Sequence, residues 1–343
     1  MQAEPGQREP GPAQRAGQAA GPPGPVDVAI TEDIWGPPLE ELARSRSVLR
    51  EPSAWQSPAG LAAAASRARA LVVRNRSQVD RGLLEACPRL RVVARAGVGL
   101  DNIDVAAAQA RGVAVIAPLG ANAVSVAEHT LGLALALARR LVPLDRECRS
   151  GGWDRVPGRE LSGAVWGLLG AGATGLACGR LATAVGARVL AYDPFAGGRD
   201  TELAAAGIRL ASLDGVLGEA EILSCHLPAT AGTRHFVDAD LLARMRRGAL
   251  FINVGRGSVV DEEALAAVLE SGHLGGAGLD VREQEPPHPG VLERLDNVVL
   301  TPHVAGMTEQ SQQRILQVLA ADIAAVLDGG SPSNAVTVPV AAP

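Results

Sequence analysis

Three ionisable side chains in the last third of the sequence have the chemistry to oxidise an alcohol next to a carboxylate. Arg256 lies in NVGRGSVVDEEAL, Glu285 in LDVREQEPP and His303 in LTPHVAG, and each follows a short apolar run typical of a buried strand. A guanidinium can hold a carboxylate through two hydrogen bonds. An imidazole can take up or release the alcohol proton near neutral pH. A neighbouring carboxylate would orient that imidazole and favour its charged form.

A glycine-rich turn provides a candidate cofactor site for such a reaction. VWGLLG runs into Gly170-Ala171-Gly172-Ala173-Thr174-Gly175, and an Ala- and Leu-rich stretch follows. The glycines permit close approach to a pyrophosphate at the N-terminus of a helix. Asp193 lies 18 residues beyond Gly175, where an acid can accept hydrogen bonds from the adenosine ribose. Because an acid there repels a 2'-phosphate, the sequence favours NAD over NADP. The alternative is a glycine-rich turn in a fold without a ligand.

Short apolar runs alternate with helical segments over most of the chain. Continuous apolar runs indicate a parallel sheet that is buried on both faces and connected by crossover helices. One such series covers residues 26–118, and a second runs from residue 163 to NVVLTPH at 297–303. Ligands of these sheets bind at the carboxyl ends of the strands, where the three candidate catalytic residues lie. The predicted fold class is α/β with two doubly wound parallel sheets.

Two helices are expected to join the two sheets. Residues 122–141 are nearly free of polar side chains and must be covered on most faces, whereas residues 310–327 are amphipathic at helical spacing. The chain would cross between two domains twice and leave a cleft between them. The predicted divisions are a disordered tail at 1–25, a substrate domain at 26–118 and 305–330, a cofactor domain at 119–304, and a second tail at 331–343.

Composition limits the classes of function and partner. The 343 residues are 47% hydrophobic and 20% charged, which indicates packed domains. All 32 basic residues are Arg, so chemistry that needs a lysine is excluded. The net charge of -5 and the few aromatic residues (4 Trp, 3 Phe and 1 Tyr) argue against nucleic acid as a partner. No apolar run approaches the roughly 18 residues that a membrane span needs.

Spacing argues against metal binding and against a nucleophilic Ser or Cys. The 4 Cys form no CxxC motif, so free thiols in a reducing cytoplasm are expected. Neither a HExxH motif nor a GxSxG elbow is present. His129, within the apolar helix, is expected to be a satisfied core or interface residue. For His226, lining the cofactor pocket and lying in an ordinary loop both remain open.

Six motifs in order resemble the D-2-hydroxyacid dehydrogenases, most closely the 3-phosphoglycerate dehydrogenase branch. They are RAGVGLDNID at 95–104, ANAVSVAEHTLGLALALAR from 121, GAGATG, NVGRG, GLDV and TPH, and the resemblance covers about residues 26–330. It implies a flavodoxin-like substrate domain and a Rossmann NAD-binding domain. It also implies a catalytic triad of Arg256, Glu285 and His303, hydride transfer to the nicotinamide, and a homodimer built around residues 122–161.

The same resemblance implies roles that spacing alone does not. Backbone N–H groups of Val98 and Gly99 would hold the substrate carboxylate, and Arg74 would help to hold an anionic substrate. Further cofactor contacts would come from Ala173 and Thr174 in the phosphate turn, Leu227 and Thr233 along the cofactor, Val254 before the arginine turn, and Asp280 at the nicotinamide amide.

Three stretches depart from the family's common pattern. GATG at 172–175 replaces GRIG and loses an Arg, so weaker pyrophosphate binding is expected. Ala117-Pro118-Leu119 replaces Asn-Thr-Pro, and Arg282-Glu283-Gln284 replaces Phe-Thr-Glu. The last two departures lie near the substrate cleft and bear on specificity.

The predicted function is NAD-dependent interconversion of a small anionic 2-hydroxy acid and its 2-keto acid. The resemblance makes 3-phosphoglycerate the best candidate substrate. Reduction of glyoxylate or hydroxypyruvate is an alternative, because it needs only Arg256 and the loop amides. A non-catalytic NAD-sensing protein, similar to the corepressors that use this fold, is an alternative of a different class. Such a sensor has no need of all three catalytic groups.

Overall fold

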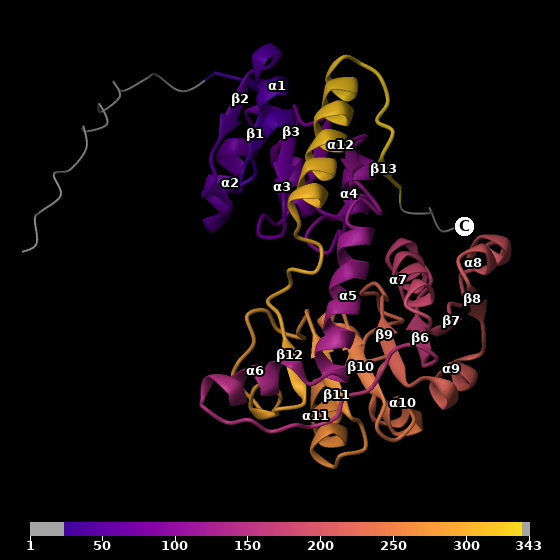
Figure 1. Ribbon diagram of the computed structural model, residues 1–343. Coiled ribbons are helices and arrows are strands. Elements are labelled where there is room, and N and C mark those ends of the chain that lie inside the picture. Colours follow the sequence, from indigo (N-terminus) through magenta and orange to yellow (C-terminus); the bar gives the residue numbers. More distant parts are fainter. Residues whose placement is uncertain (1–23, 338–343) are drawn as a thin grey trace, which may run out of the picture.

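Two parallel β-sheets with helices on both faces form the two lobes of the molecule (Figure 1). The computed structural model describes residues 24–337, so nearly all of the predicted tail at 1–25 lies outside the described residues. The prediction of an α/β fold with two doubly wound sheets is confirmed. Within residues 24–337, no helix is both long and apolar enough to cross a membrane.

The smaller lobe contains a six-stranded sheet in the order β13-β5-β4-β3-β1-β2. Apart from β13 its strands are parallel, and the order 2-1-3-4-5 is that of flavodoxin-like folds. The elements of this lobe are β1 (Val26–Ile30), α1 (Pro37–Ser45), β2 (Val48–Arg50), η1 (Ala54–Gln56), α2 (Pro58–Ala65), β3 (Ala68–Val73), α3 (Arg81–Ala86), β4 (Val92–Arg95), α4 (Val105–Ala110), β5 (Ala114–Ile116), α12 (Glu309–Leu327) and β13 (Ala335–Val336).

The larger lobe contains a seven-stranded parallel sheet in the order β12-β11-β10-β9-β6-β7-β8. This is the Rossmann order with one added strand, and the order reverses between β6 and β9, where such sheets bind dinucleotides. Its elements are α5 (Ala123–Ala138), α6 (Leu141–Arg149), β6 (Val165–Leu169), α7 (Ala173–Ala184), β7 (Arg188–Tyr192), α8 (Asp200–Ala205), β8 (Ile208–Leu210), α9 (Leu213–Glu219), β9 (Ile222–Cys225), α10 (Ala239–Arg244), β10 (Leu250–Asn253), η2 (Gly257–Val259), α11 (Glu262–Glu270), β11 (Gly276–Leu279), η3 (Leu292–Arg294) and β12 (Val298–Leu300).

Apolar clusters fill the space between each sheet and its helices. In the smaller lobe, α2, α3 and α4 cover one face, and α1 and α12 cover the other. In the larger lobe, α5 and α7 cover one face, and α9, α10 and α11 cover the other. Burial of the strand side chains on both faces is the main favourable contribution to folding. The two sheets are thereby rigid frames whose strand ends carry the loops of the site.

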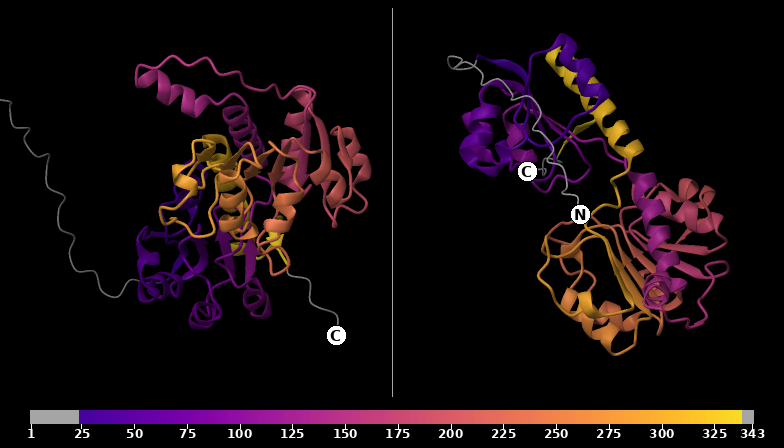
Figure 2. Two further views of the ribbon diagram at one scale, coloured as in Figure 1. Left: turned by 90° about the horizontal axis from the view of Figure 1, so that it is seen from below. Right: turned by 60° about the vertical axis from the view of Figure 1, so that its left-hand side comes forward.

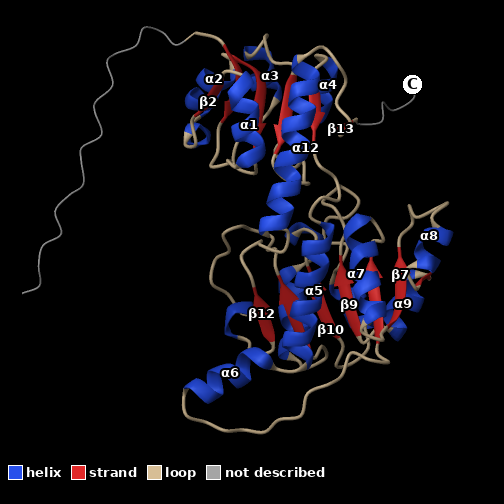
Figure 3. Cartoon of the chain, turned by 45° about the horizontal axis from the view of Figure 1, so that its top comes forward, coloured by secondary structure: helices blue, strands red, loops and turns tan. Residues whose placement is uncertain are grey.

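Helices α5 and α12 follow the two segments in which the chain passes between the lobes (Figures 1 and 3). Thr308 caps α12 in a reciprocal arrangement with Ser311, so the helix begins where the chain leaves the larger lobe. The Thr308 hydroxyl also lies 2.8 Å from the hydroxyl of Ser125 on α5. This contact ties the two crossings together next to the cleft.

Helix α6 and the segment after it project from the larger lobe (Figures 2 and 3). The helix expected at 122–141 is present as α5, which ends at Ala138; Arg140 then has a left-handed backbone with φ of 53°, and a second helix, α6, begins after it. No residue of α6 is buried, and residues 152–160 contain no helix or strand. We refer to residues 141–160 as the arm.

The end of the described chain differs from the predicted tail at 331–343. Asp322 on α12 accepts hydrogen bonds from the backbone N–H groups of Ser333 and Asn334, both at 2.9 Å. These bonds turn the chain back, so that Ala335 and Val336 pair with β5 in antiparallel fashion. The short strands β2 (VLR) and β8 (IRL) also lack a predicted counterpart, because an arginine leaves only two apolar residues in each. The domain boundaries at residues 118 and 304 stay predictions.

Candidate active site

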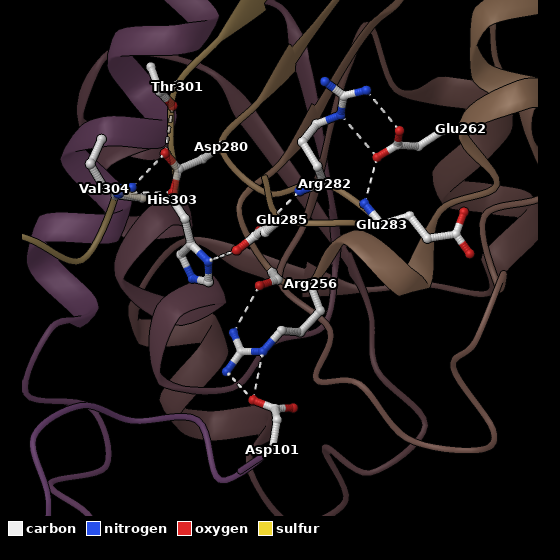
Figure 4. Close-up of polar contacts among 12 residues, drawn as sticks. Asp101, Arg256, Glu262, Asp280, Arg282, Glu283, Glu285, Thr301, His303 and Val304 are labelled. Atoms are coloured by element: carbon white, nitrogen blue, oxygen red, sulfur yellow. Dashed lines mark hydrogen bonds and ion pairs between the residues drawn. The ribbon is translucent and has the colours of Figure 1, made fainter. Parts of the chain in front are cut away.

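The three predicted catalytic residues follow three adjacent strands of the larger sheet. Arg256 comes after β10, Glu285 after β11 and His303 after β12, and these strands are neighbours in the sheet. Carboxyl ends of parallel strands meet at one edge, which brings residues distant in sequence into one group. Figure 4 shows the three side chains gathered at this edge.

His303 and Glu285 form a hydrogen-bonded pair. The Nδ1 atom of His303 lies 2.7 Å from Oε2 of Glu285, while Oε1 of Glu285 accepts a hydrogen bond from the backbone N–H of Arg282 at 3.1 Å. Burial alone would raise the pKa of Glu285, but the hydrogen bond and charge of His303, the Arg282 amide and the charge of Arg256 lower it below its ordinary value. Glu285 is therefore held as a carboxylate that orients the imidazole. Its bond to Nδ1 leaves Nε2 of His303 for a substrate.

Asp280 fixes the loop that carries His303. Its carboxylate accepts hydrogen bonds from the hydroxyl of Thr301 at 2.5 Å and from the N–H groups of Val304 and Ala305, both at 2.9 Å. The N–H of His303 donates to the backbone carbonyl of Asp280 at 2.7 Å. These bonds hold His303 in a left-handed backbone conformation, with φ of 56°, that is unusual for a residue other than glycine.

Asp280 is expected to bond the nicotinamide amide, whereas in the structure its carboxylate bonds the loop that carries His303. Asp280 is 1% exposed, and its two carboxylate oxygens are turned toward the loop after β12. The geometry makes Asp280 a positioning residue, and a direct bond to the cofactor stays a prediction. His129 supports this network, because its Nε2 atom lies 3.0 Å from the Thr301 hydroxyl that donates to Asp280. The expectation that His129 is a satisfied interior residue agrees with this contact.

Arg256 spans the cleft to the smaller lobe. Its Nε and Nη2 atoms each donate to Oδ2 of Asp101 at 3.2 Å. A Cβ atom at Gly99 would lie 1.9 Å from Nη2 of Arg256, so only glycine lets the loop after β4 approach the guanidinium this closely. Val98, next to Gly99, is half-buried in the same loop. The predicted substrate loop and the predicted catalytic arginine are thus in direct contact.

Two further arginines of the smaller lobe lie on the same side of the cleft. Arg74 follows β3, and its Nε atom donates to the backbone carbonyl of Ala96 at 3.4 Å. Arg95 ends β4, and its guanidinium lies against Gly97. Burial, with repulsion from Arg256 and Arg74, lowers the pKa of Arg95 to about 10. Crowded, partly buried guanidinium groups repel one another, and a bound anion relieves that repulsion.

Glu32 shapes the loop around Arg74. Its carboxylate accepts hydrogen bonds from the backbone N–H groups of Arg74 at 2.7 Å and Ser77 at 3.0 Å, and from those of Asn75 and Arg76. Glu32 is only 5% exposed. A buried carboxylate at the end of β1 therefore determines the path of the loop after β3.

The glycine turn between β6 and α7 fits a dinucleotide pyrophosphate. Gly170 has φ of 91°, and a Cβ atom at Gly175 would lie 2.1 Å from the carbonyl oxygen of Gly170. Both positions therefore require glycine. A Cβ atom at Gly172 would meet nothing within 4 Å, and no side chain caps the N-terminus of α7 there. The turn thus presents open space and the free N–H groups of a helix start, including those of Ala173 and Thr174, to an anion.

The other predicted cofactor residues surround this turn. Asp193 follows β7 beside it and accepts the N–H of Ala171 at 2.9 Å. Leu227 follows β9 and lies across the switch point from Gly170. Thr233 donates to the carbonyl of Pro228 at 2.6 Å, and Val254 is buried after β10. All four positions lie at the carboxyl edge of the sheet.

His226 lies beneath the glycine turn, where its backbone touches Gly170. Burial lowers its pKa to about 4, and its Nε2 atom lies 3.0 Å from the hydroxyl of Ser224. The imidazole is therefore neutral, and His226 packs next to Gly170 and Gly175 of the turn.

Three residues of the site were not singled out from the sequence. Arg95 and Asp101 both stand in RAGVGLDNID, at the end of a strand and in the loop beyond it, so their position was a usable signal. Glu32 follows β1 in the same way. Only the tertiary structure places these charges beside Arg256 and Arg74.

Comparison with known proteins points to one family. The model described as "D-isomer specific 2-hydroxyacid dehydrogenase, NAD binding domain" matches residues 131–305. The (S)-sulfolactate dehydrogenase of Chromohalobacter salexigens is 42% identical over 294 residues, which cover 84% of this chain and 94% of that protein. The D-3-phosphoglycerate dehydrogenase of Archaeoglobus fulgidus is 38% identical over 273 residues, 79% of this chain but 51% of that protein. The crystal structure of the TT0316 protein from Thermus thermophilus is 33% identical, with a TM-score of 0.81, and covers 91% of this chain and 100% of that one.

The lowered pKa of Glu285 predicts a pH-dependent contribution to stability. Such a carboxyl group stabilises the fold above its unfolded pKa, about 4.3, and ceases to do so as the pH falls through its lower folded pKa. Since His303 and Glu285 are 46% and 39% exposed, we expect Glu285→Gln to lower the free energy of unfolding at pH 7 by less than about 1 kcal/mol. Urea unfolding near pH 7 and near pH 3 measures the difference.

The control for this experiment is Glu270→Gln, at the exposed end of α11, which should change stability little at either pH. A Glu285→Gln defect that persists unchanged in acid would mean that packing, rather than the carboxylate charge, is responsible.

Proposed function

Because the chain belongs to the family of D-isomer specific 2-hydroxyacid dehydrogenases, we propose that it interconverts a small D-2-hydroxy acid and its 2-keto acid with NAD. The observation that carries the proposal is the convergence of Arg256, Glu285 and His303 at one sheet edge, beside a glycine turn that fits a dinucleotide. A protein that only senses NAD has no need of the oriented His303–Glu285 pair.

His303 acts as the general acid and base. With Nδ1 bonded to Glu285, its Nε2 atom takes the proton of the 2-hydroxyl group when the alcohol is oxidised and returns it to the carbonyl oxygen on reduction. Glu285 stabilises the positive charge that the imidazole gains on oxidation. Reduction therefore starts from protonated His303.

Arg256 holds the substrate for this transfer. Its guanidinium can grip the substrate carboxylate and polarise the C2 oxygen, in place of the contact that it makes with Asp101. Backbone N–H groups of Val98 and Gly99 bind the other side of the carboxylate. The close packing of Gly99 against Arg256 places both sets of donors on one group.

The cofactor is held by the turn Gly170–Gly175, with Asp193 on the adenosine ribose and Leu227, Thr233 and Val254 along its length. When bound there, NAD supplies the acceptor or donor of the hydride at C2 of the substrate. Asp193 disfavours a 2'-phosphate, so NAD should be used in preference to NADP. The turn lacks the arginine of the common family pattern and relies on backbone N–H groups.

Arg74 and Arg95 support a substrate with a second anionic group. Burial, then repulsion from Arg256 and Arg74, lowers the pKa of Arg95 to about 10, so this region holds more guanidinium charge than a lone carboxylate needs. Sulfolactate and 3-phosphoglycerate, the substrates named for the two relatives, both carry an anion on the third carbon atom. We infer that the substrate belongs to this class, with 3-phosphoglycerate as the first candidate. Glyoxylate and hydroxypyruvate lack the second anion and are the alternatives.

The arm supports assembly as a homodimer. Trp153 is 80% exposed and Leu141 is 53% exposed, and both lie on a segment that projects from the larger lobe. Large exposed apolar side chains clustered on one surface are typical of protein interfaces.

A cytoplasmic location stays a prediction. Among the described residues the cysteines are free thiols, of which Cys148 is exposed and the others are buried, as suits a reducing compartment.

A substrate panel tests the second-anion proposal. We expect phosphohydroxypyruvate or sulfopyruvate to be reduced with a higher kcat/KM than glyoxylate or hydroxypyruvate, and faster with NADH than with NADPH. Arg95→Met should raise KM for the favoured acid by on the order of 10–100-fold, the loss expected for a charged hydrogen bond. KM for glyoxylate is the internal control. Equal loss on both acids would contradict a role in binding the second anion.

Replacement of the imidazole tests the catalytic assignment. His303→Asn should lower kcat by at least about 100-fold, because acid and base catalysis is lost, while binding of NADH stays near its wild-type value. Steady-state rates and a fluorescence titration of NADH measure the two effects. The matched control is His273→Asn, since His273 lies at the far end of the sheet near Met245. Unchanged kcat in His303→Asn would remove this residue from the mechanism.

Light scattering coupled to gel filtration tests the dimer. We expect a mass of twice the 35.1 kDa chain for the wild type. Leu141→Asp in the arm should shift the mass toward the monomer, because a charge would be buried in the interface. Val185→Asp, at a 37% exposed position outside the arm, is the control and should remain dimeric. A monomeric wild type would contradict the assembly.

A further inference from the structure

We propose that Arg282 is a positioning residue, which holds Glu285 against His303 by anchoring the loop between β11 and η3. The proposal rests on the function proposed above, because it gives that loop a role in catalysis. Arg282 stands where the sequence departs from the aromatic residue common in the family. Figure 4 shows its side chain directed toward Glu262, and Arg282 lines one pocket together with Glu285 and His303.

The guanidinium of Arg282 is bound by two carboxylates. Its Nε and Nη2 atoms donate to the two oxygens of Glu262 at 3.0 and 2.9 Å, and Nη1 pairs with Glu293. The Arg282 side chain is only 10% exposed. A two-point contact of this kind fixes both the position and the plane of the guanidinium. Three elements, the loop after β11, the first turn of α11 and η3, are thereby joined at one point.

Both carboxylates also bind the backbone of the same loop. Oε1 of Glu262 accepts the N–H of Glu283 at 2.6 Å, and Oε2 of Glu293 accepts the N–H of Gly290 at 2.7 Å. The loop is therefore held at two backbone positions as well as at the Arg282 side chain. These two positions lie on either side of Glu285 in the sequence.

The anchored backbone acts directly on the catalytic groups. The N–H of Arg282 donates to Oε1 of Glu285, while Oε2 of Glu285 bonds His303, so the orientation of the carboxylate depends on where residue 282 lies. The same backbone packs on the residue after the catalytic arginine, since a Cβ atom at Gly257 would lie 1.8 Å from the carbonyl oxygen of Arg282. A shift of the loop would therefore disturb the pair and the turn that carries Arg256.

The effect on Glu285 can be measured without a substrate through the tautomer of His303. A carboxylate that accepts from Nδ1 keeps the proton of the neutral imidazole on that atom. Two-bond ¹H–¹⁵N correlation spectra of labelled holoenzyme, at a pH where the imidazole is neutral, report which nitrogen carries the proton. The His303 signal is identified by its absence in His303→Gln, and Glu285→Ala gives the reference for an unheld imidazole.

We expect Arg282→Met, which keeps an unbranched apolar stem but removes both ion pairs, to move His303 toward the spectrum of Glu285→Ala. Arg282→Lys, which keeps the charge but not the two-point contact, should restore part of the wild-type tautomer. The control is Arg188→Met, which removes the exposed 2.8 Å pair with Glu219 on another edge of the sheet and should leave the signal unchanged.

Kinetics give a second measurement. Displacement of an acid and base group by about 1 Å lowers rates on the order of 100-fold, so kcat of Arg282→Met should fall by about 10- to 100-fold. KM for NADH should stay near the wild-type value, because the glycine turn is untouched. If no 2-hydroxy or 2-keto acid is turned over by the wild type, the proposed function fails, while the tautomer still decides the positioning role.

Glu293→Gln provides the same test with a smaller perturbation, in case Arg282→Met does not fold. It removes one ion pair and keeps the shape of the side chain, so a smaller shift in the same direction is expected. The proposal is overturned if the wild-type imidazole does not carry its proton on Nδ1. It is also overturned if folded Arg282→Met, or Glu293→Gln in its place, retains the wild-type tautomer.

Discussion

The hydrogen bond between His303 and Glu285 is the contact on which the rest of the site depends. It joins the loops that follow two adjacent strands, β11 and β12, and it determines which nitrogen of the imidazole faces the cleft. Neither side chain is buried enough for packing alone to hold it, since both are more than a third exposed. The pair therefore relies on the backbone around it, and that backbone is fixed by hydrogen bonds to the carboxylates of Asp280 and Glu262.

Carboxylates that follow a strand or begin a helix organise the loops of both lobes. Asp280 binds the loop that carries His303, Glu262 binds the loop that carries Glu285, and Glu32 binds the loop that carries Arg74. Each accepts backbone N–H groups that the parallel sheet leaves unpaired at the ends of its strands. An ionised acceptor makes stronger hydrogen bonds than a neutral one, so a single side chain can fix several residues of irregular chain. The loops that carry Arg74, Glu285 and His303 are thus shaped by the carboxylates of other residues.

Much of the architecture could be predicted because its signals are local. Three patterns each predict the conformation of the residues that form them: the continuous apolar strands, the GAGATG turn and the amphipathic segment at 310–327. The parts that could not be predicted depend on partners far along the chain. β13 exists because Asp322 turns the chain back onto β5, and α6, which was not expected, begins after the left-handed backbone of Arg140. A three-residue edge strand such as β2 carries no pattern of its own, since its neighbour in the sheet defines it.

The sequence by itself determined the types of chemical group and their placement after strands, because strand periodicity and the glycine turn are properties of short segments. From these follow the two doubly wound sheets and the choice of Arg256, Glu285 and His303. Only the tertiary structure decided that Arg95 and Asp101 share the cleft with Arg256, and that Asp280 is turned toward the loop of His303. No role for Arg282, which departs from the family pattern, follows from the sequence alone. Its ion pairs with Glu262 and Glu293 are visible only in the tertiary structure. The physical reason is that charges act through space, and a chain folded into two lobes brings together side chains that its sequence keeps apart.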